Sequence, residues 1–182
     1  MIKIIIVIEG ADLTGKTTFI NELSKRIKNS IKIKLPKVID LNRNQAQIER
    51  LINNAAYVEM DSEKNVVWLV DRFITSALIY SKFQKRETYL SIKDIESKNH
   101  LIFILYASEN VLRKRYRERK DTFFSIEEIL KLNNFFLNFF EENKNRLNGR
   151  LFLLRNDNKY DLIKNIKKIE EVVEKWMKKL KK

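Results

Sequence analysis

The chain has 182 residues, 44% of them hydrophobic, which is enough for one domain with a buried core. Lysine and arginine number 37 and aspartate and glutamate 24, so the formal net charge is +13. With no cysteine and a single histidine, the composition excludes disulfides, thiolate metal sites, cysteine nucleophiles and clusters of histidine metal ligands. The lack of cysteine and of an export signal predicts a cytoplasmic protein.

Five short apolar runs predict the strands of a buried sheet, at residues 2–8, 31–35, 66–70, 101–106 and 151–154. Stretches with helical spacing of apolar residues separate them, namely Phe19, Leu23 and Ile27, the stripe Ile48, Leu51, Ile52, Ala55 and Val58, the segment 126–140 and the stripe at 162–180. We interpret the stripes as core or helix packing and not as cofactor sites. Strands that alternate with helices predict a single α/β domain over residues 1–182, with three layers and a five-stranded parallel sheet.

A glycine-rich loop follows the first predicted strand. The chain has three glycines, and two of them stand five residues apart in the pattern G-x-x-x-x-G-K-T at residues 10–17. Loops of this type bind phosphate groups through backbone N–H groups and the positive end of the next helix. We therefore expect a P-loop NTPase fold in which ATP is bound by Gly10, Ala11, Asp12, Leu13, Thr14, Gly15, Lys16, Thr17 and Thr18.

Magnesium and the transferred phosphate have predicted partners near this loop. Lys16 supplies a positive charge between the β and γ phosphates, and the Thr17 hydroxyl is placed to bind Mg²⁺. Asp71 ends the third predicted strand, and because the carboxyl ends of parallel strands share one edge, its carboxylate is expected near the same ion.

Further polar residues predict a kinase that phosphorylates a small acceptor. Asp12 places a carboxylate inside the loop, where it can orient an acceptor hydroxyl, and Arg72 follows the metal-site acid, where it can bind a second phosphate. Ser76 and Tyr80 lie one and two turns further on and can line an acceptor pocket. Four arginines, Arg113, Arg115, Arg117 and Arg119, crowd residues 111–121, and arginine clusters of this kind can meet the charge that spreads during phosphoryl transfer.

Two other classes of P-loop protein stay open. Residues 158–161 read N-K-Y-D, which matches the guanine-reading pattern of regulatory GTPases, but Asp71 lacks the glycine that the D-x-x-G switch of that class requires. The other class is an ATPase that acts on nucleic acid or on a partner protein.

Three motifs together resemble the thymidylate kinases, a family of P-loop nucleoside monophosphate kinases. They are E-G-A-D-L-T-G-K-T-T at residues 9–18, D-R-F-I-T-S at 71–76 and the arginine-rich segment that ends at Asp121. The resemblance implies transfer of the γ-phosphoryl group of ATP to dTMP, giving dTDP, with Mg²⁺, a homodimer and a mobile lid at residues 113–121.

The resemblance also implies roles for individual residues. Lys16 would hold the donor phosphates, Asp12 would meet the 3′-hydroxyl of the acceptor sugar, and Arg72 would bind the acceptor phosphate. In some members the loop carries a catalytic arginine at the position of Leu13. A lid arginine, Arg117 or Arg119, would then take this role.

The chain departs from the family at the acceptor side. After the second strand Lys37 stands where an arginine is usual, and Asn53 and Tyr57 occupy the positions expected to read the base. Tyr57 or Tyr80 would then stack on the base, and another (deoxy)nucleotide or a nucleoside stays open as the acceptor. His100 is expected to be a solvated residue before a strand and not a general base.

The positive charge predicts small anionic ligands. Lysine is spread over the whole chain, and no basic block is interleaved with aromatic residues as stacking on nucleic acid requires. The longest apolar run, residues 101–107, falls far short of the roughly 20 residues of a membrane helix. We therefore expect no nucleic-acid partner and no membrane.

Overall fold

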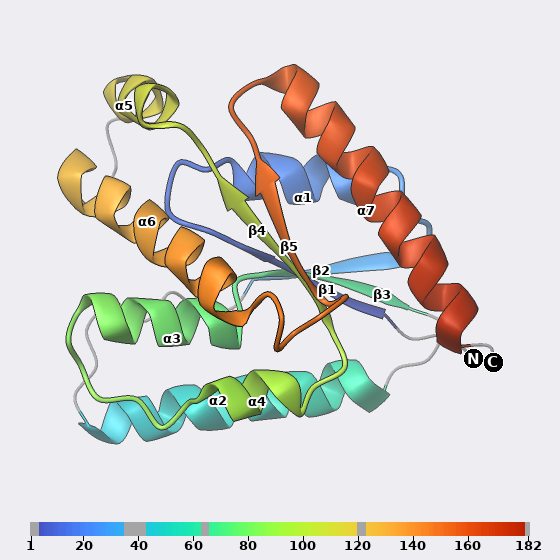
Figure 1. The fold of residues 1–182 in the computed structure, drawn as a ribbon. Helices are drawn as coiled ribbons and strands as arrows, with labels where there is room; N and C mark the ends of the chain where they lie inside the picture. The colour runs from blue at the N-terminus through green and yellow to red at the C-terminus, as the bar shows by residue number, and fades with distance from the viewer. Residues whose placement is uncertain (1–3, 35–42, 63–65, 120–122, 181–182) are drawn as a thin grey trace.

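The computed structural model describes residues 4–34, 43–62, 66–119 and 123–180, and within them one sheet of five parallel strands. The strand order is β2-β3-β1-β4-β5 (Figure 1). The strands are β1 (Ile4–Glu9), β2 (Ser30–Lys34), β3 (Val67–Asp71), β4 (Leu101–Tyr106) and β5 (Leu151–Arg155). The four parallel pairings confirm the predicted five-stranded parallel sheet, and each strand overlaps one of the five predicted segments.

Helices cover both faces of the sheet, as a parallel sheet requires. One face carries α1 (Lys16–Ser24) and α7 (Lys159–Leu180) (Figure 1). The other carries α2 (Arg43–Ser62), α3 (Ile74–Phe83), α4 (Ile92–Glu96) and α6 (Ile126–Asn143), while α5 (Glu109–Glu118) stands beyond the end of β4 and contacts α6. Residues of β1 alternate between two cores, so the predicted three-layer architecture is confirmed.

The apolar stripe of α2 faces outward. Leu51 and Val58 are 67% and 66% exposed, whereas Asn53 and Met60 of the same helix are buried. The interpretation of this stripe as core packing is therefore wrong for its central residues. Of the helices in the described ranges, none is both long and apolar enough to cross a membrane.

His100 is buried and not solvated, which corrects the expectation for this residue. It is 2% exposed, and its ring packs edge-on against Phe73 with centroids 5.8 Å apart. Burial, together with the charges of Arg150 and Lys98, lowers its pKa to about 3. The imidazole is thus a neutral part of the core where β4 begins.

Candidate functional site

The glycine-rich loop joins β1 to α1, and its backbone has a positive φ at three positions, two of which are glycines. Gly10 and Gly15 have φ of 140° and 88°, in the region that side chains disfavour. A Cβ at Gly10 would collide with the carbonyl oxygen of Leu105, and one at Gly15 would lie 2.7 Å from Asn156 Nδ2. Leu13 also adopts a positive φ, 65°. Leu105 of β4 and Asn156, which follows β5, therefore pack closely against the loop and leave no room for a side chain at either glycine.

Lys16 curls back over the inside of this loop. Its Nζ donates to the carbonyl oxygen of Ala11 at 2.6 Å, and the Thr14 hydroxyl donates to the same oxygen at 2.9 Å. Burial, with the nearby charge of Arg72, lowers the pKa of Lys16 to about 7. The loop thus holds a desolvated cation where anionic oxygens would stabilise it.

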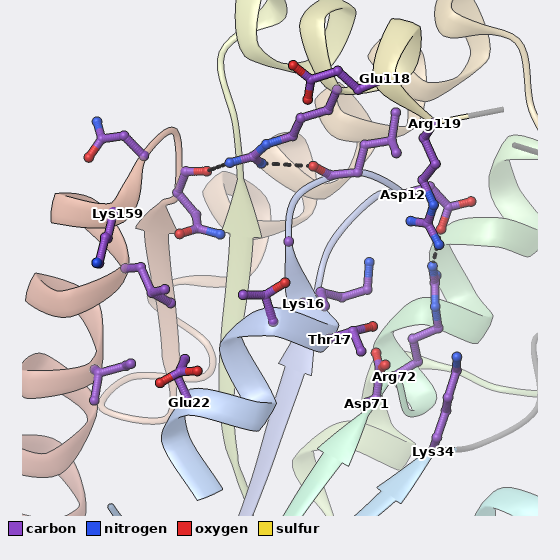
Figure 2. A pocket seen from close by; sticks show the side chains of 18 of the residues that line it. Asp12, Lys16, Thr17, Glu22, Lys34, Asp71, Arg72, Glu118, Arg119 and Lys159 are labelled. Carbon is purple, nitrogen blue, oxygen red and sulfur yellow. Dashed lines mark hydrogen bonds and ion pairs between the residues drawn. The ribbon is translucent and has the colours of Figure 1, made fainter. Parts of the chain in front are cut away.

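Arg72 faces the loop from the end of β3. Its φ of 70° turns the side chain back across the carboxyl edge of the sheet. One guanidinium nitrogen donates to the Tyr80 hydroxyl at 2.6 Å, and the other pairs with the Asp12 carboxylate at 2.5 Å (Figure 2). The structure therefore brings together Asp12, Arg72 and Tyr80, three of the residues predicted to bind the acceptor.

Glu9 fixes the start of α3 beside Arg72. Its carboxylate accepts the backbone N–H groups of Phe73 at 2.9 Å and Ser76 at 3.2 Å, and the Ser76 hydroxyl as well. Burial raises the pKa of Glu9 to about 7, although these hydrogen bonds oppose the shift. Ser76 is thus buried and bonded to Glu9, a position that does not support its predicted place in the lining of an acceptor pocket.

Asp71 and Thr17 form a site that fits a magnesium ion. Asp71 is 6% exposed, and its Oδ1 has no hydrogen-bond partner among the described residues. Thr17, in the first turn of α1, is drawn beside it in Figure 2, and both line the same cleft. A buried carboxylate oxygen without a donor, next to a hydroxyl, matches the oxygen ligands that Mg²⁺ prefers. Within the described ranges no three His, Asp or Glu side chains gather, so phosphate and water would complete the shell.

A cleft of about 1330 Å³ runs from this point along the loop. One wall carries Lys34, Asp71 and Arg72, and the other is formed by the loop after β5 and the first turns of α7. Several predicted residues line it, namely Asp12, Leu13, Gly15, Lys16, Thr17, Thr18, Asp71, Arg72 and Arg119. The cleft is large enough for two nucleotide-sized ligands.

The four arginines of the predicted lid point in different directions. Arg113 pairs with Glu109 and Glu127 on the outer surface. Arg115 donates to main-chain carbonyl oxygens of the phosphate loop and of the loop after β5. Arg119 lines the cleft and extends toward Asp12 in Figure 2, whereas exposed Arg117 is not part of the cleft lining. Of the two arginines predicted to be catalytic, the structure brings only Arg119 to the cleft.

Three predicted acceptor residues, Tyr57, Ser76 and Tyr80, are not among the residues that line this cleft. The Tyr57 hydroxyl accepts the backbone N–H of Asn99, and the Lys98 ammonium lies over its ring, 4.6 Å from the centroid. Asn99 precedes β4, whereas the cleft lies at the carboxyl ends of the strands, so the structure contradicts stacking of Tyr57 on the acceptor base. Lys37 lies outside the described residues.

The N-K-Y-D segment caps a helix. The Asn158 side chain accepts the N–H of Asp161 at 3.0 Å, and the Asp161 carboxylate accepts the N–H of Asp157 at 3.0 Å. Both bonds satisfy backbone donors at the start of α7. Asn158 and Lys159 line the cleft, but Asp161 turns back toward its own loop. Its carboxylate therefore does not face the cleft as guanine reading requires.

Sequence reasoning missed Asn156 and Lys34. Asn156 is buried and donates from Nδ2 to the carbonyl oxygen of Thr14 at 2.7 Å. Lys34 pairs in register with Asp71 and lines the cleft (Figure 2). The signal that could have found both is their position, because each stands at the carboxyl end of a parallel strand, where ligands of such sheets bind.

The sheet order, the glycine loop and Lys16 define the P-loop nucleotide-binding fold. No family model and no curated protein matches the sequence. Among solved structures, a deoxyadenosine kinase from M. mycoides matches at TM-score 0.63 and 16% identity, over 92% of this chain and 100% of its own. The YorR protein from Bacillus subtilis matches at TM-score 0.65 and 23% identity, over 93% of this chain and 95% of its own. A thymidylate kinase from Ehrlichia chaffeensis matches at TM-score 0.62 and 14% identity, over 94% of this chain and 98% of its own. The chain therefore has the fold of P-loop kinases.

Proposed function

We propose that this protein transfers the γ-phosphoryl group of ATP to a nucleoside monophosphate, with dTMP as the first candidate and dTDP as its product. The observation that carries the proposal is buried Arg72, which pairs with Asp12 of the phosphate loop and lines the same cleft as Lys16. A phosphate loop alone binds a triphosphate, whereas a buried guanidinium opposite it supplies a second phosphate site. The solved structures with this fold include two thymidylate kinases, which are named for a nucleoside monophosphate substrate, and this supports the proposal.

Each side chain has a distinct task in this reaction. Lys16 and the loop N–H groups hold the donor phosphates, and Arg72 exchanges its contact with Asp12 for the acceptor phosphate. Asp12 is then available to orient a sugar hydroxyl of the acceptor. Thr17 and Asp71 would hold Mg²⁺, which neutralises charge on the phosphates when it is bound.

Catalysis in this site depends on position and charge. An acceptor phosphate is ionised at neutral pH, so the reaction needs no general base, and buried His100 lies outside the cleft lining. Charge that spreads over the transferred group is met by Lys16 and by Arg119. We propose Arg119 as the catalytic lid arginine, because it lines the cleft and Arg117 does not.

A different nucleotide or nucleoside acceptor is the second candidate. One observation favours it: Tyr57, the residue expected to stack on thymine, lies away from the cleft. The M. mycoides structure is described as a deoxyadenosine kinase with dCMP and dCDP bound as products, so this fold also accepts other bases. A nucleoside acceptor would need a carboxylate for its hydroxyl proton, whereas Asp12 is paired with Arg72.

We further propose that the protein is a homodimer and works in the cytoplasm, where ATP and nucleoside monophosphates are available. The resemblance to thymidylate kinases suggests the dimer. The outward apolar stripe of α2, with exposed Leu51 and Val58, offers the contact surface.

A coupled assay of ADP or GDP release tests the function. Every ribo- and deoxyribonucleoside monophosphate, and every nucleoside, is offered with Mg²⁺ and ATP or GTP as donor. We expect turnover with a monophosphate, dTMP first, and its loss in Lys16→Ala. Release that is independent of any acceptor, or turnover with nucleosides alone, would refute the proposal.

The acceptor side has its own test. Arg72→Ala should lower kcat/KM for the monophosphate by about a hundredfold or more, because a buried charged hydrogen bond to phosphate is lost, while ATP binding stays near normal. An unchanged acceptor kcat/KM would remove Arg72 from the acceptor site.

A further inference from the structure

Two side chains from outside the glycine motif hold the phosphate loop by consecutive carbonyl groups. Arg115, on α5, donates from Nη1 to the carbonyl oxygen of Leu13 at 2.8 Å. Asn156, which follows β5, donates from Nδ2 to the carbonyl oxygen of Thr14 at 2.7 Å. Both hydrogen bonds approach the loop from the side of β5 and α5, and both donors line the cleft.

Fixing these carbonyl groups fixes the next two amides. None of the described peptide bonds is cis. In a trans peptide the C=O and N–H groups point in opposite directions, so a carbonyl held outward turns the following N–H inward. The bond from Arg115 therefore orients the N–H of Thr14, and the bond from Asn156 orients the N–H of Gly15. Converging N–H groups of this kind form the concave nest that binds anionic oxygens.

The two donors are themselves joined. Arg115 Nη2 donates to the main-chain oxygens of Asn156 at 2.9 Å and Asp157 at 3.1 Å. One guanidinium therefore ties α5, the loop after β5 and the phosphate loop together. A planar fork with five N–H donors can bridge such separated acceptors, whereas a lysine ammonium is a point donor.

We propose that Arg115 and Asn156 are positioning residues for the donor phosphates: they orient the Thr14 and Gly15 amides and so set the affinity for a triphosphate without contacting it. This inference rests on the proposed function only in that the loop binds a triphosphate, and it makes no use of the acceptor. It gives two residues outside the glycine motif an indirect role in phosphate binding, through the amides that they orient.

Calorimetry with the full chain tests the proposal, with inorganic tripolyphosphate and with ATP, each with Mg²⁺, as the probes. Arg115→Ala, Arg115→Lys and Asn156→Ala should each weaken both probes about tenfold or more, the scale of a lost hydrogen bond to a charged or buried group. Because tripolyphosphate has no base or sugar, a loss of affinity for it in the variants reports on the phosphate contacts alone. Arg113→Ala is the matched control on the same helix, since Arg113 bonds only to Glu109 and Glu127 among the described residues, and it should bind both probes as the wild type does.

A second readout separates positioning from general destabilisation. In ¹H–¹⁵N spectra the Thr14 and Gly15 amide protons should move downfield when tripolyphosphate binds to the wild type and to Arg113→Ala. At saturating ligand the Thr14 shift should shrink in Arg115→Ala and the Gly15 shift in Asn156→Ala, while the melting temperatures of both variants stay within a few degrees. In steady state the KM for ATP should rise and the KM for the acceptor should not.

Two results would overturn the inference. One is unchanged tripolyphosphate affinity in the Arg115 and Asn156 variants. The other is weaker binding with full Thr14 and Gly15 shifts and a matching fall in melting temperature, which would show a structural role alone. A wild type that binds tripolyphosphate but transfers no phosphoryl group would refute the proposed function and leave this test intact, whereas a wild type that binds neither probe would refute both.

Discussion

Lys16 is a buried cation whose charge depends on what lies beside it. Its pKa is lowered to about 7 by burial and by Arg72, and a bound triphosphate would raise the pKa again. The free protein therefore carries less charge at Lys16 at pH 8 than the complex does. We expect binding of ATP with Mg²⁺ at pH 8 to take up about one proton, and almost none at pH 6. Above pH 7 the affinity should fall by about tenfold per pH unit until the pKa of the complex is reached.

Titration calorimetry in buffers of different ionisation enthalpy measures this uptake directly. Lys159→Gln is the matched control, because it removes another amine that lines the same cleft. Its proton uptake should equal that of the wild type. Equal uptake at pH 6 and pH 8 in the wild type would show that Lys16 is already charged in the free protein.

At the scale of the element, α3 begins on a carboxylate from a different strand. Glu9 of β1 binds the first backbone N–H groups of α3, and its pKa of about 7 lies above the ordinary 4.5. Between these values the folded protein binds more protons than the unfolded chain, so the free energy of unfolding falls as the pH rises. We expect wild type to lose about 3 kcal/mol more than Glu9→Gln between pH 4.5 and pH 8.

Urea unfolding of both proteins across this range measures the difference. The comparison cancels other titrating groups, such as His100, whose lowered pKa makes stability fall instead as the pH drops below about 6.5. Parallel stability curves for the two proteins would show that the pKa of Glu9 is the same in the folded and unfolded states, and so would contradict the raised pKa.

The arginines of α5 and its C-terminal end occupy different places. Arg115 donates to main-chain oxygens of the phosphate loop and of the loop after β5, whereas Arg119 follows the last turn of α5 and lines the cleft. We expect Arg119→Ala to lower kcat by on the order of 10³-fold, the scale for an arginine that meets phosphoryl-transfer charge. Arg117→Ala, a neighbour on the outer side, should change kcat by less than about threefold. A larger loss in Arg117→Ala, measured in the same coupled assay, would reverse the assignment.

At the scale of the whole molecule, the sequence predicted the features that residue types at neighbouring positions determine, such as strands and the phosphate loop. The β-branched run at 2–8 marked β1, and two glycines in a chain with only three marked the phosphate loop. Tyr57 and Ser76 were misplaced because their contacts depend on how helices pack, which spacing along one chain does not determine. The partners of Arg115 are main-chain oxygens, which any residue type provides, so they leave no pattern in the sequence.

The last whole-molecule property is association. Leu51 and Val58 lie two turns apart on α2 and are 67% and 66% exposed, which suits a contact between two copies. Each copy carries a net charge of +13, so the copies repel, and screening by salt should strengthen a dimer held by apolar contact. We expect light scattering to give twice 21.9 kDa, with dissociation at low salt. Leu51→Glu combined with Val58→Glu should give a folded monomer, while Tyr160→Glu, at another exposed apolar residue, should stay dimeric. A wild type that is monomeric at high salt would contradict the α2 interface.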